Sequence, residues 1–233
     1  PKPRDIHKAS VRDRVLHHAV YKVLYPEYDK TFISDSYSCR INKGTHKAIY
    51  RFEKYTRKVS QNYTKQCWVL KCDIRKFFAS IDQNTLIKIL EQKILDRDIL
   101  NLLQNIIQSF DSGIDAKGLP LGNLTSQLLV NIYMNEFDQY VKHNLKQEYY
   151  IRYADDFVFV SDDKKYLESV LFEINIFLKN KLCLDLHPNK CFFKTIYSGV
   201  DFLGWVHFPR HRVLRTSTKK RVLQNINDTN ISS

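Results

Sequence analysis

The segment from Tyr149 to Ser161 limits the possible folds more than any other part of the chain. It reads YYIRYADDFVFVS, so two adjacent carboxylates, Asp155 and Asp156, lie between short aromatic and β-branched runs. Such runs are typical of strands, and the Ala-Asp-Asp interruption is typical of a tight turn. The pattern predicts a buried hairpin with acidic residues at its tip. Taken alone, this is most simply an Asp-rich structural turn, and a chemical role requires a third carboxylate elsewhere.

Composition places the chain among globular proteins. Its 233 residues are 43% hydrophobic and 13% aromatic, which is enough for one large domain or for two lobes that share a core. No apolar run approaches the roughly 18 residues of a membrane span, and the N-terminus lacks the apolar stretch of a secretory signal. We therefore expect a cytoplasmic protein with no membrane partner. The five cysteines form no C-x-x-C pair and the eight histidines show no ligand spacing, so neither disulfides nor a zinc site are expected.

Charge is distributed unevenly along the chain. The net charge is +12, with balances of +10 in residues 1–71, −3 in residues 72–203 and +5 in residues 204–233. Any single basic cluster can be an ordinary solvated surface. Two basic flanks around an acidic centre suit a polyanion held over a cation site, and nucleic acid is the commonest such polyanion.

The N-terminal part is predicted to contain two helices. Ser10 is a suitable N-cap for the first helix. Apolar residues then recur near helical spacing at Val11, Val15, Ala19, Tyr21, Val23 and Leu24. The sequence Asn42-Lys43-Gly44 predicts a turn, with Thr45 as the cap of a second, basic helix. Arg40 and Lys43 flank this turn, which is either a phosphate cradle or an ordinary solvated loop.

Further along, the pattern predicts strands alternating with helices. Cys67 to Cys72 is an apolar run that predicts a buried strand, which would deliver Asp73 at its exposed end. The periodic stretch 86–106 predicts one long or two short helices, and the glycine-rich loop 111–122 precedes another helix. A helix over 164–180, a strand over 181–187 and a turn at 188–190 complete an α+β chain. Its antiparallel sheet is expected to carry helices on one face.

Three segments taken together resemble the reverse transcriptase family. These are DIRKFFASID from Asp73, LPLGNLTSQ from Leu119, and YADD from Tyr153, followed by FLGW. The match extends over nearly all 233 residues and implies a right-hand polymerase fold. It places a basic, fingers-like segment at 1–66 and a palm at 67–208, whose helical insertion 83–125 belongs partly to the fingers. Residues 209–233 would be the start of a thumb or a basic tail.

The resemblance also implies chemistry at the acidic residues. The family adds nucleotides with two divalent cations about 3.5–4 Å apart, here expected to be Mg²⁺ with Mn²⁺ as a substitute. It assigns Asp73 and Asp155 as bridging carboxylates, Asp156 as the third acid and the carbonyl of Ile74 as a further ligand. Lys190 matches a lysine that protonates the leaving pyrophosphate.

Other roles follow from matching positions. Phe78 matches a steric gate that favours deoxynucleotides, although a core Phe would fit the same pattern. The remaining candidates for nucleotide binding are Arg4, Arg40, Lys43, Leu121, Gly122 and Gln127. Those for primer and template are Tyr153, Asn123, Leu203, Gly204 and Trp205. The implied partners are an RNA template, a DNA or RNA primer and deoxynucleoside triphosphates.

The loop sequence LGNLTSQ narrows the resemblance. It is similar to diversity-generating retroelement enzymes, as are the opening SVRDRVLHHAV and FLGWVHFPRHRVLRTS. That subfamily copies a template-repeat RNA with errors at adenines and works with a small basic accessory protein. A bacterial defence or group II intron-type enzyme, and a non-catalytic RNA-binding module, are the alternatives. About thirty residues follow Trp205, so a short or missing thumb and weak processivity are expected.

Overall fold

The computed structural model describes residues 10–110 and 116–230. Its main helices are α1 (Val11–Asp29), α2 (Thr45–Val59), α3 (Phe77–Ser80), α4 (Gln83–Glu91), α5 (Arg97–Gln108), α6 (Leu124–Gln139), α7 (Lys164–Leu182) and α8 (Thr216–Asn230). A π-helical turn (Tyr140–Asn144) extends α6, and a short 3₁₀ turn covers Ile196–Ser198. None of the helices in the two described ranges has the length and hydropathy needed to cross a membrane.

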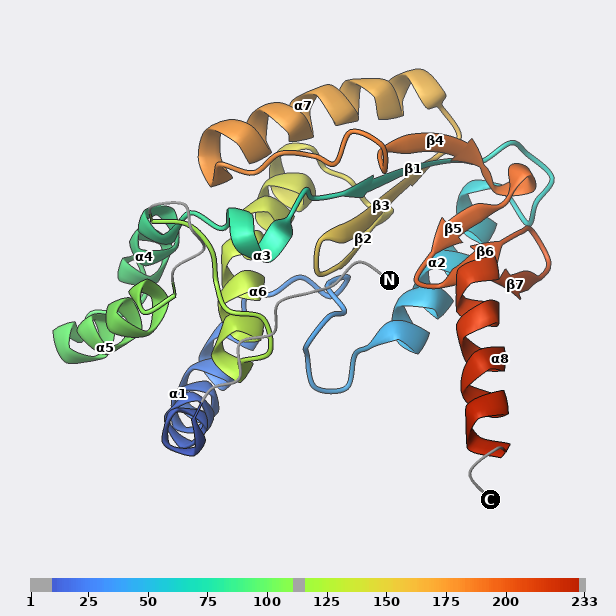
Figure 1. The fold of residues 1–233 in the computed structure, drawn as a ribbon. Helices are drawn as coiled ribbons and strands as arrows, with labels where there is room; N and C mark the ends of the chain where they lie inside the picture. Colours follow the sequence, from blue (N-terminus) through green and yellow to red (C-terminus); the bar gives the residue numbers. More distant parts are fainter. Residues whose placement is uncertain (1–9, 111–115, 231–233) are drawn as a thin grey trace.

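Two antiparallel sheets organise the chain (Figure 1). The central sheet has the order β2-β3-β1-β4, and the smaller one has the order β5-β6-β7. Their strands are β1 (Trp68–Asp73), β2 (Tyr150–Tyr153), β3 (Asp156–Ser161), β4 (Phe192–Thr195), β5 (Val200–Phe202), β6 (Trp205–His207) and β7 (Arg212–Leu214). The predicted hairpin at residues 149–161 and the strand that ends in Asp73 are therefore confirmed.

Side-chain alternation in the central strands divides the core into two layers. In β1, Leu70 and Cys72 pack with α6 and α7, whereas Val69 and the preceding Cys67 lie in a second cluster against α2 and β5. The prediction of helices on one face is wrong, because α2 covers the opposite face. The strands read as nearly continuous apolar runs because both of their faces are buried.

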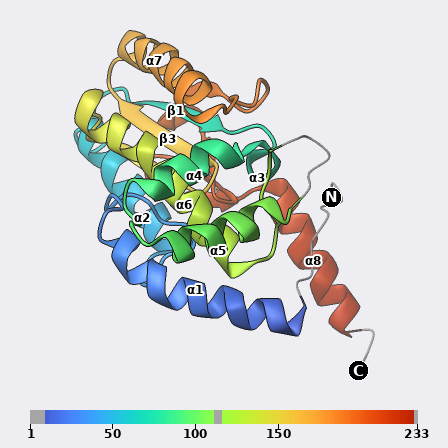
Figure 2. The same ribbon diagram turned by 90° about the vertical axis from the view of Figure 1, so that its left-hand side faces the viewer.

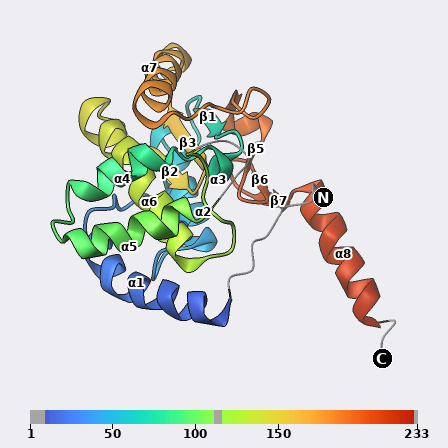
Figure 3. The same cartoon turned by 60° about the vertical axis from the view of Figure 1, so that its left-hand side comes forward.

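A group of helices surrounds α6 on one side of the molecule. Figures 2 and 3 show α1, α4 and α5 together with α6, while α8 projects away from this body. The stretch 86–106 forms two helices, because Asp96 caps α5 by accepting from the backbone N–H groups of residues 98 and 99. Almost every turn of α6 is buried, including Leu128, Tyr133 and Phe137, which confirms the helix predicted after the glycine-rich loop.

Two local predictions are wrong. Thr45 is not a cap: Gly44, at φ +104°, is the N-cap of α2, and the Thr45 hydroxyl donates to Tyr153 instead. Residues 181–187 form no strand, because α7 continues to Leu182 and a left-handed Cys183 ends it. In α1, capped by Ser10 as predicted, Val11, Val15 and Val23 are exposed, and Leu24, Tyr25 and Tyr28 provide the buried contacts.

Candidate active site

Strand register brings the predicted acids together. Asp73, the last residue of β1, lies directly opposite Asp156, the first residue of β3. Cross-strand neighbours have Cβ atoms about 4.5–5.5 Å apart. Asp155 occupies the β2–β3 turn, and its carbonyl oxygen accepts a hydrogen bond of 3.2 Å from the backbone N–H of Ile74. Sheet pairing therefore gathers four predicted positions at one end of the central strands β1 and β3: Asp73, Ile74, Asp155 and Asp156. We call this end of the sheet the acidic edge or carboxylate edge.

The turn that carries Asp155 is strained. Ala154 has φ +56°, in the left-handed region that residues with a Cβ rarely adopt. Such a conformation costs on the order of 1–3 kcal/mol and persists only where surrounding contacts hold it. One of those contacts is the Arg152 guanidinium, which donates to the Ala154 carbonyl at 3.2 Å.

Asp156 lies in an unfavourable electrostatic environment, with 19% of its side chain exposed. Its Oδ2 lies 3.2 Å from the ammonium group of Lys71, while its buried Oδ1 has no hydrogen-bond partner among the described atoms. Burial raises the pKa of Asp156 to about 7; Lys71 opposes this shift, and repulsion from Asp155 and Asp73 adds to it. Three carboxylates concentrated at one sheet edge provide a negative potential that favours a bound cation.

Lys190 lies beside these carboxylates. Its Nζ is 2.9 Å from each carboxylate oxygen of Asp73. The turn at residues 188–190 holds it there, with the Lys190 N–H donating to His187 and the His187 N–H donating to the Asp73 carbonyl at 2.7 Å. In this arrangement the lysine occupies the space on Asp73 that a cation would share.

The donor set suits a hard divalent cation. Asp73, Asp155 and Asp156 offer hard carboxylate oxygens, and the unpartnered Oδ1 of Asp156 is an acceptor available to a cation. Within residues 10–110 and 116–230, however, no three His, Cys, Asp or Glu side chains already converge on one point. Lys190 and Lys71 are the present counter-charges. These residues would therefore hold an ion after the Lys190–Asp73 contact opens.

The described part of the glycine-rich loop, residues 116–122, lies beside Phe78. Leu119 donates its N–H to the Phe78 carbonyl at 2.9 Å, and the half-buried Phe78 ring packs edge-on against Phe77. Gly122 has φ +105°, which favours glycine, and Asn123 begins α6 without a side-chain cap. Uncapped N–H groups at a helix N-terminus can bind an anion. The half-buried Leu121 and Gln127 flank this point.

The two basic residues of the loop before α2 have partners within the protein. Arg40, with 6% of its side chain exposed, bonds Asp29 at 2.6 Å and the carbonyls of Ile33 and Ser36. Lys43 donates to the Ser34 carbonyl at 2.6 Å. Arg40 thus holds the 29–40 loop together, and its guanidinium already has partners at the atoms that would bind a phosphate. Arg4 lies outside the described residues.

Three of the predicted primer-side residues lie in a second hairpin. Leu203 and Gly204, at φ +50° and +84°, make the two-residue turn between β5 and β6. Trp205 follows it, with the guanidinium of Arg212 over its ring at 5.0 Å. Tyr153 belongs to β2, and its hydroxyl accepts from Thr45 at 3.1 Å.

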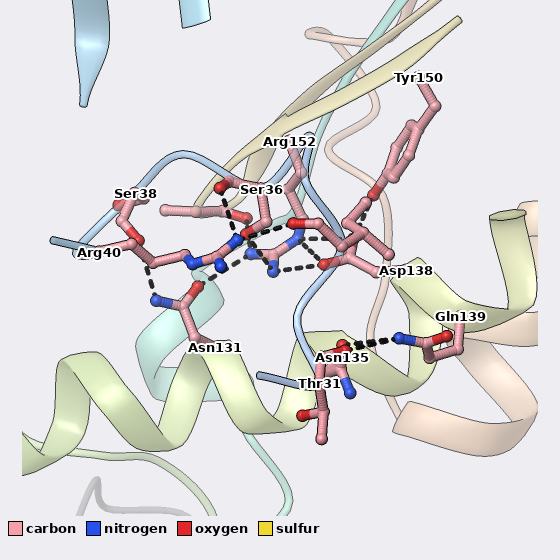
Figure 4. A network of polar contacts seen from close by, with 12 residues as sticks. Thr31, Ser36, Ser38, Arg40, Asn131, Asn135, Asp138, Gln139, Tyr150 and Arg152 are labelled. Carbon is pink, nitrogen blue, oxygen red and sulfur yellow. Dashed lines mark hydrogen bonds and ion pairs between the residues drawn. The ribbon is translucent and has the colours of Figure 1, made fainter. Parts of the chain in front are cut away.

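A fully buried ion pair, Arg152 with Asp138, was not predicted (Figure 4). Asp138 of α6 accepts from Nε and an NH2 group of Arg152 at 2.7–3.0 Å and from the Tyr150 hydroxyl at 2.7 Å. Arg152 also donates to Asn131 and Ser36. The network joins α6, β2 and residues 35–38 behind the acidic turn.

Lys71 was also missed, although the sequence contains a signal for it. Residues 71 and 73 of one strand point to the same face, so a Lys two positions before Asp73 must lie near the carboxylates. No comparable signal marks Asp138, because a polar residue within a helical pattern is usually exposed.

The sheet and its acidic edge define the class. An antiparallel sheet with one acid at the end of β1 and two at the β2–β3 turn, covered by helices, is the palm of a right-hand polymerase fold. Solved structures support this fold: apo telomerase from Candida tropicalis, truncated from its C-terminal domain, has a TM-score of 0.64 at 12% identity, over 86% of this chain and 45% of that one. Telomerase from Candida albicans has a TM-score of 0.59 at 12% identity, over 86% and 37%.

Sequence comparison then gives the family. Residues 1–207 match "Reverse transcriptase (RNA-dependent DNA polymerase)", and the chain belongs to this family. Protein YkfC of Escherichia coli is 27% identical, over 90% of this chain and 63% of its own length. The group II intron-encoded protein LtrA of Lactococcus lactis is 23% identical, over 90% and 44%. The chain thus spans less than two thirds of these relatives.

Proposed function

We propose that the chain is an RNA-directed DNA polymerase, which adds deoxynucleotides to a primer on an RNA template. The observation that carries this proposal is the strand register that sets Asp73 opposite Asp156, with Asp155 in the adjoining turn. Membership of the reverse transcriptase family supports it.

The side chains at this edge have separate roles in the proposed reaction. Two Mg²⁺ ions held by Asp73, Asp155 and Asp156 would stabilise charge on the attacking and leaving oxygens. Lys190, released from Asp73, is within reach of the same site and can donate a proton to the leaving pyrophosphate. The incoming nucleotide would lie next to the carboxylates, between Phe78 and the N-terminus of α6. There the Phe78 ring would disfavour a ribose 2′-hydroxyl.

For the biological setting, we propose a diversity-generating retroelement enzyme. The supporting feature is the LGNLTSQ sequence, in which Leu121 and Gly122 precede the helix N-terminus proposed above for the nucleotide. Such an enzyme copies template-repeat RNA with errors at adenines and acts with a small basic accessory protein. The second candidate is a group II intron-type enzyme, which the similarity to LtrA favours. Sequencing of cDNA made from a defined RNA template separates them: errors concentrated at adenines support the first, and evenly distributed errors the second.

The proposed activity is tested by primer extension on an RNA template with Mg²⁺. Asp155→Asn keeps the size of the side chain and removes its charge, so we expect the extension rate to fall at least about 100-fold. The matched control is Asp162→Asn, which changes an exposed aspartate beyond the end of β3 and should leave the rate unchanged. Equal activity of wild type and Asp155→Asn would refute the mechanism. RNA binding without extension by the wild type would identify a non-catalytic module instead.

A further inference from the structure

A groove of about 840 Å³ lies between α2 and the turn that joins β6 to β7. Its α2 side runs from Tyr50 past the end of the helix to Tyr63, and its other side is residues 208–212. We call it the lateral groove. The role proposed above for the carboxylate edge does not use it.

The lateral groove leads away from the carboxylates. Thr45, the first residue of α2, contacts Tyr153 beside the acidic turn. Lys58, near the other end of α2, pairs with Glu148 at 2.9 Å, just before β2 begins. The helix has 15 residues and is roughly 22 Å long at 1.5 Å per residue. The groove therefore follows α2 toward the end of the sheet that is far from the carboxylates.

The groove is strongly basic. Its lining contains four cationic side chains and one carboxylate, an excess of three positive charges: Lys54, Arg57, Arg210 and Arg212 against Glu53. Lys54, Arg57 and Arg210 are exposed, and Glu53 is already paired with Arg212 at 2.5 Å. An excess of exposed, closely spaced cations is the usual electrostatic feature of a phosphate-backbone site.

Exposed aromatic rings lie among these charges. Tyr50 is 70% exposed, although a tyrosine ring is usually at least half covered in a folded protein. His211 is stacked on Phe208 with 4.9 Å between ring centroids and an interplanar angle of 11°. Flat rings beside a basic track are the recurring way to bind unpaired bases, because every base has a face that can stack. A duplex keeps its base faces covered, so the combination favours a single strand.

Tight packing holds the hairpin side of the groove in place. A Cβ added at Gly199 would lie 2.8 Å from the Phe208 ring, so the backbone just before β5 approaches this ring as closely as a glycine allows. The Phe208 N–H donates to the His211 carbonyl at 2.9 Å, and Arg212 links the hairpin to α2 through Glu53. A preformed groove binds its ligand without the entropic cost of ordering a loop.

We propose that the lateral groove binds single-stranded nucleic acid, at a site separate from the carboxylate edge. The phosphates lie along Lys54, Arg57 and Arg210, and a base stacks on Tyr50. The site holds a strand while another part of the same strand, or a different one, occupies the carboxylate edge. Neither contact requires a metal ion or an incorporated nucleotide, so the inference stands apart from the proposed polymerase activity.

Binding is measured by fluorescence anisotropy with labelled 15-nucleotide RNA and DNA of one unstructured sequence, in EDTA. The groove variant is Lys54→Gln/Arg57→Gln/Arg210→Gln. The control, Lys165→Gln/Lys179→Gln/Lys181→Gln on α7, removes the same charge from another exposed surface. We expect the groove variant to bind at least tenfold more weakly. The slope of log K against log salt concentration should become shallower by about 2, at roughly 0.7 for each of three lost phosphate contacts. Equal losses in the two variants would overturn the proposal, and the tighter of the two oligonucleotides identifies the natural class.

The aromatic contact has its own test. Tyr50→Ser should weaken binding of the normal oligonucleotide about tenfold, as expected for one lost base–ring stack, and leave binding of an abasic backbone of equal length unchanged. Photo-crosslinking of 4-thiouridine RNA should modify residues 50–63 or 208–211. Crosslinks confined to the carboxylate edge would contradict a second site. Neither binding nor crosslinking depends on polymerase activity. Both results would therefore stand even if the proposed polymerase activity were refuted.

Discussion

At the residue scale, Asp156 shows how the acidic edge opposes folding. The carboxylate is largely buried, its Oδ1 has no hydrogen-bond partner among the described residues, and two further carboxylates lie near it. Lys71 compensates only in part, so the pKa remains raised to about 7. A group whose folded pKa lies above its unfolded value of 3.8 binds its proton more tightly in the native state. Its contribution to stability is therefore lost as the pH rises toward 7.

This sign gives a testable pH dependence. In EDTA, the difference in unfolding free energy between wild type and Asp156→Asn should change by about 1.4 kcal/mol per pH unit between pH 5 and 6, with the wild type losing stability as the pH rises. Above about pH 8 the difference should be constant. Urea denaturation at four pH values measures it. Lys71, Asp73 and Asp155 face this carboxyl group and are present in both proteins, so parallel curves would show that Asp156 titrates normally.

Single residues differ in how far the sequence could predict them. Asp73, Asp155 and Asp156 follow from motifs, because strand ends and a tight turn determine where their side chains lie. Arg40 was one candidate for the triphosphate from its charge and its loop, and the structure pairs it with Asp29. A basic residue in a sequence carries no sign of whether a partner distant in the chain will bind it.

At the element scale, the Arg152–Asp138 pair connects β2 to α6. Both side chains are completely buried, and Arg152 also reaches Ser36 and the Ala154 carbonyl. Because that carbonyl belongs to the strained turn, the position of the turn depends on how α6 packs against the sheet. The network thus holds the acidic turn in place from behind.

A double-mutant cycle tests this connection. Arg152→Met leaves Asp138 buried without a counter-charge and should cost about 3–5 kcal/mol of unfolding free energy. Arg152→Met/Asp138→Leu removes both charges, and its loss should be clearly smaller than the sum of the two single losses. Urea denaturation at pH 7 gives all four values. Lys30→Met, which removes an exposed pair with Glu27, is the control and should cost at most about 1 kcal/mol. Additive losses would show that the two residues act independently.

Elements were predicted well where one physical signal dominated. The hairpin, the strand before Asp73 and the helix after the glycine-rich loop all combine apolar patterning with turn residues at their ends. The strand predicted over residues 181–187 was wrong: LCLDL alternates apolar and polar residues as a strand does, but α7 continues to Leu182. The helical spacing in α1 predicted the helix but not its buried face: Tyr25 and Tyr28 pack inward, whereas Val11 and Val15 are exposed. Tertiary packing decided between faces of similar polarity.

At the scale of the whole molecule, the sequence predicted the distribution of charge better than the arrangement of helices around the core. The sequence showed basic flanks around an acidic centre, and the acidic centre indeed contains the three gathered carboxylates. It could not show that helices cover both faces of the sheet. A strand with both faces buried is continuously apolar, and such a run does not reveal which segment of the chain covers each face.

The acidic edge also links metal binding to global stability. An ion that binds only the folded state raises its stability by RT ln(1 + [ion]/Kd), about 2.7 kcal/mol at 100 times Kd. We therefore expect Mg²⁺ to raise the Tm of the wild type, by about 2–4 °C for each kcal/mol in a chain of this size. Asp73→Asn should respond less, because it loses a carboxylate ligand.

Lys190→Met should respond more strongly to Mg²⁺ than the wild type, because the ion no longer competes with the ammonium group on Asp73. Thermal unfolding at constant ionic strength, with MgCl₂ exchanged for NaCl, separates specific binding from screening. The expected order of Tm shifts is Lys190→Met, wild type, then Asp73→Asn. Equal shifts in all three would mean that Mg²⁺ stabilises the protein without occupying the acidic edge, and the two-ion role of Asp73 would then have to be abandoned.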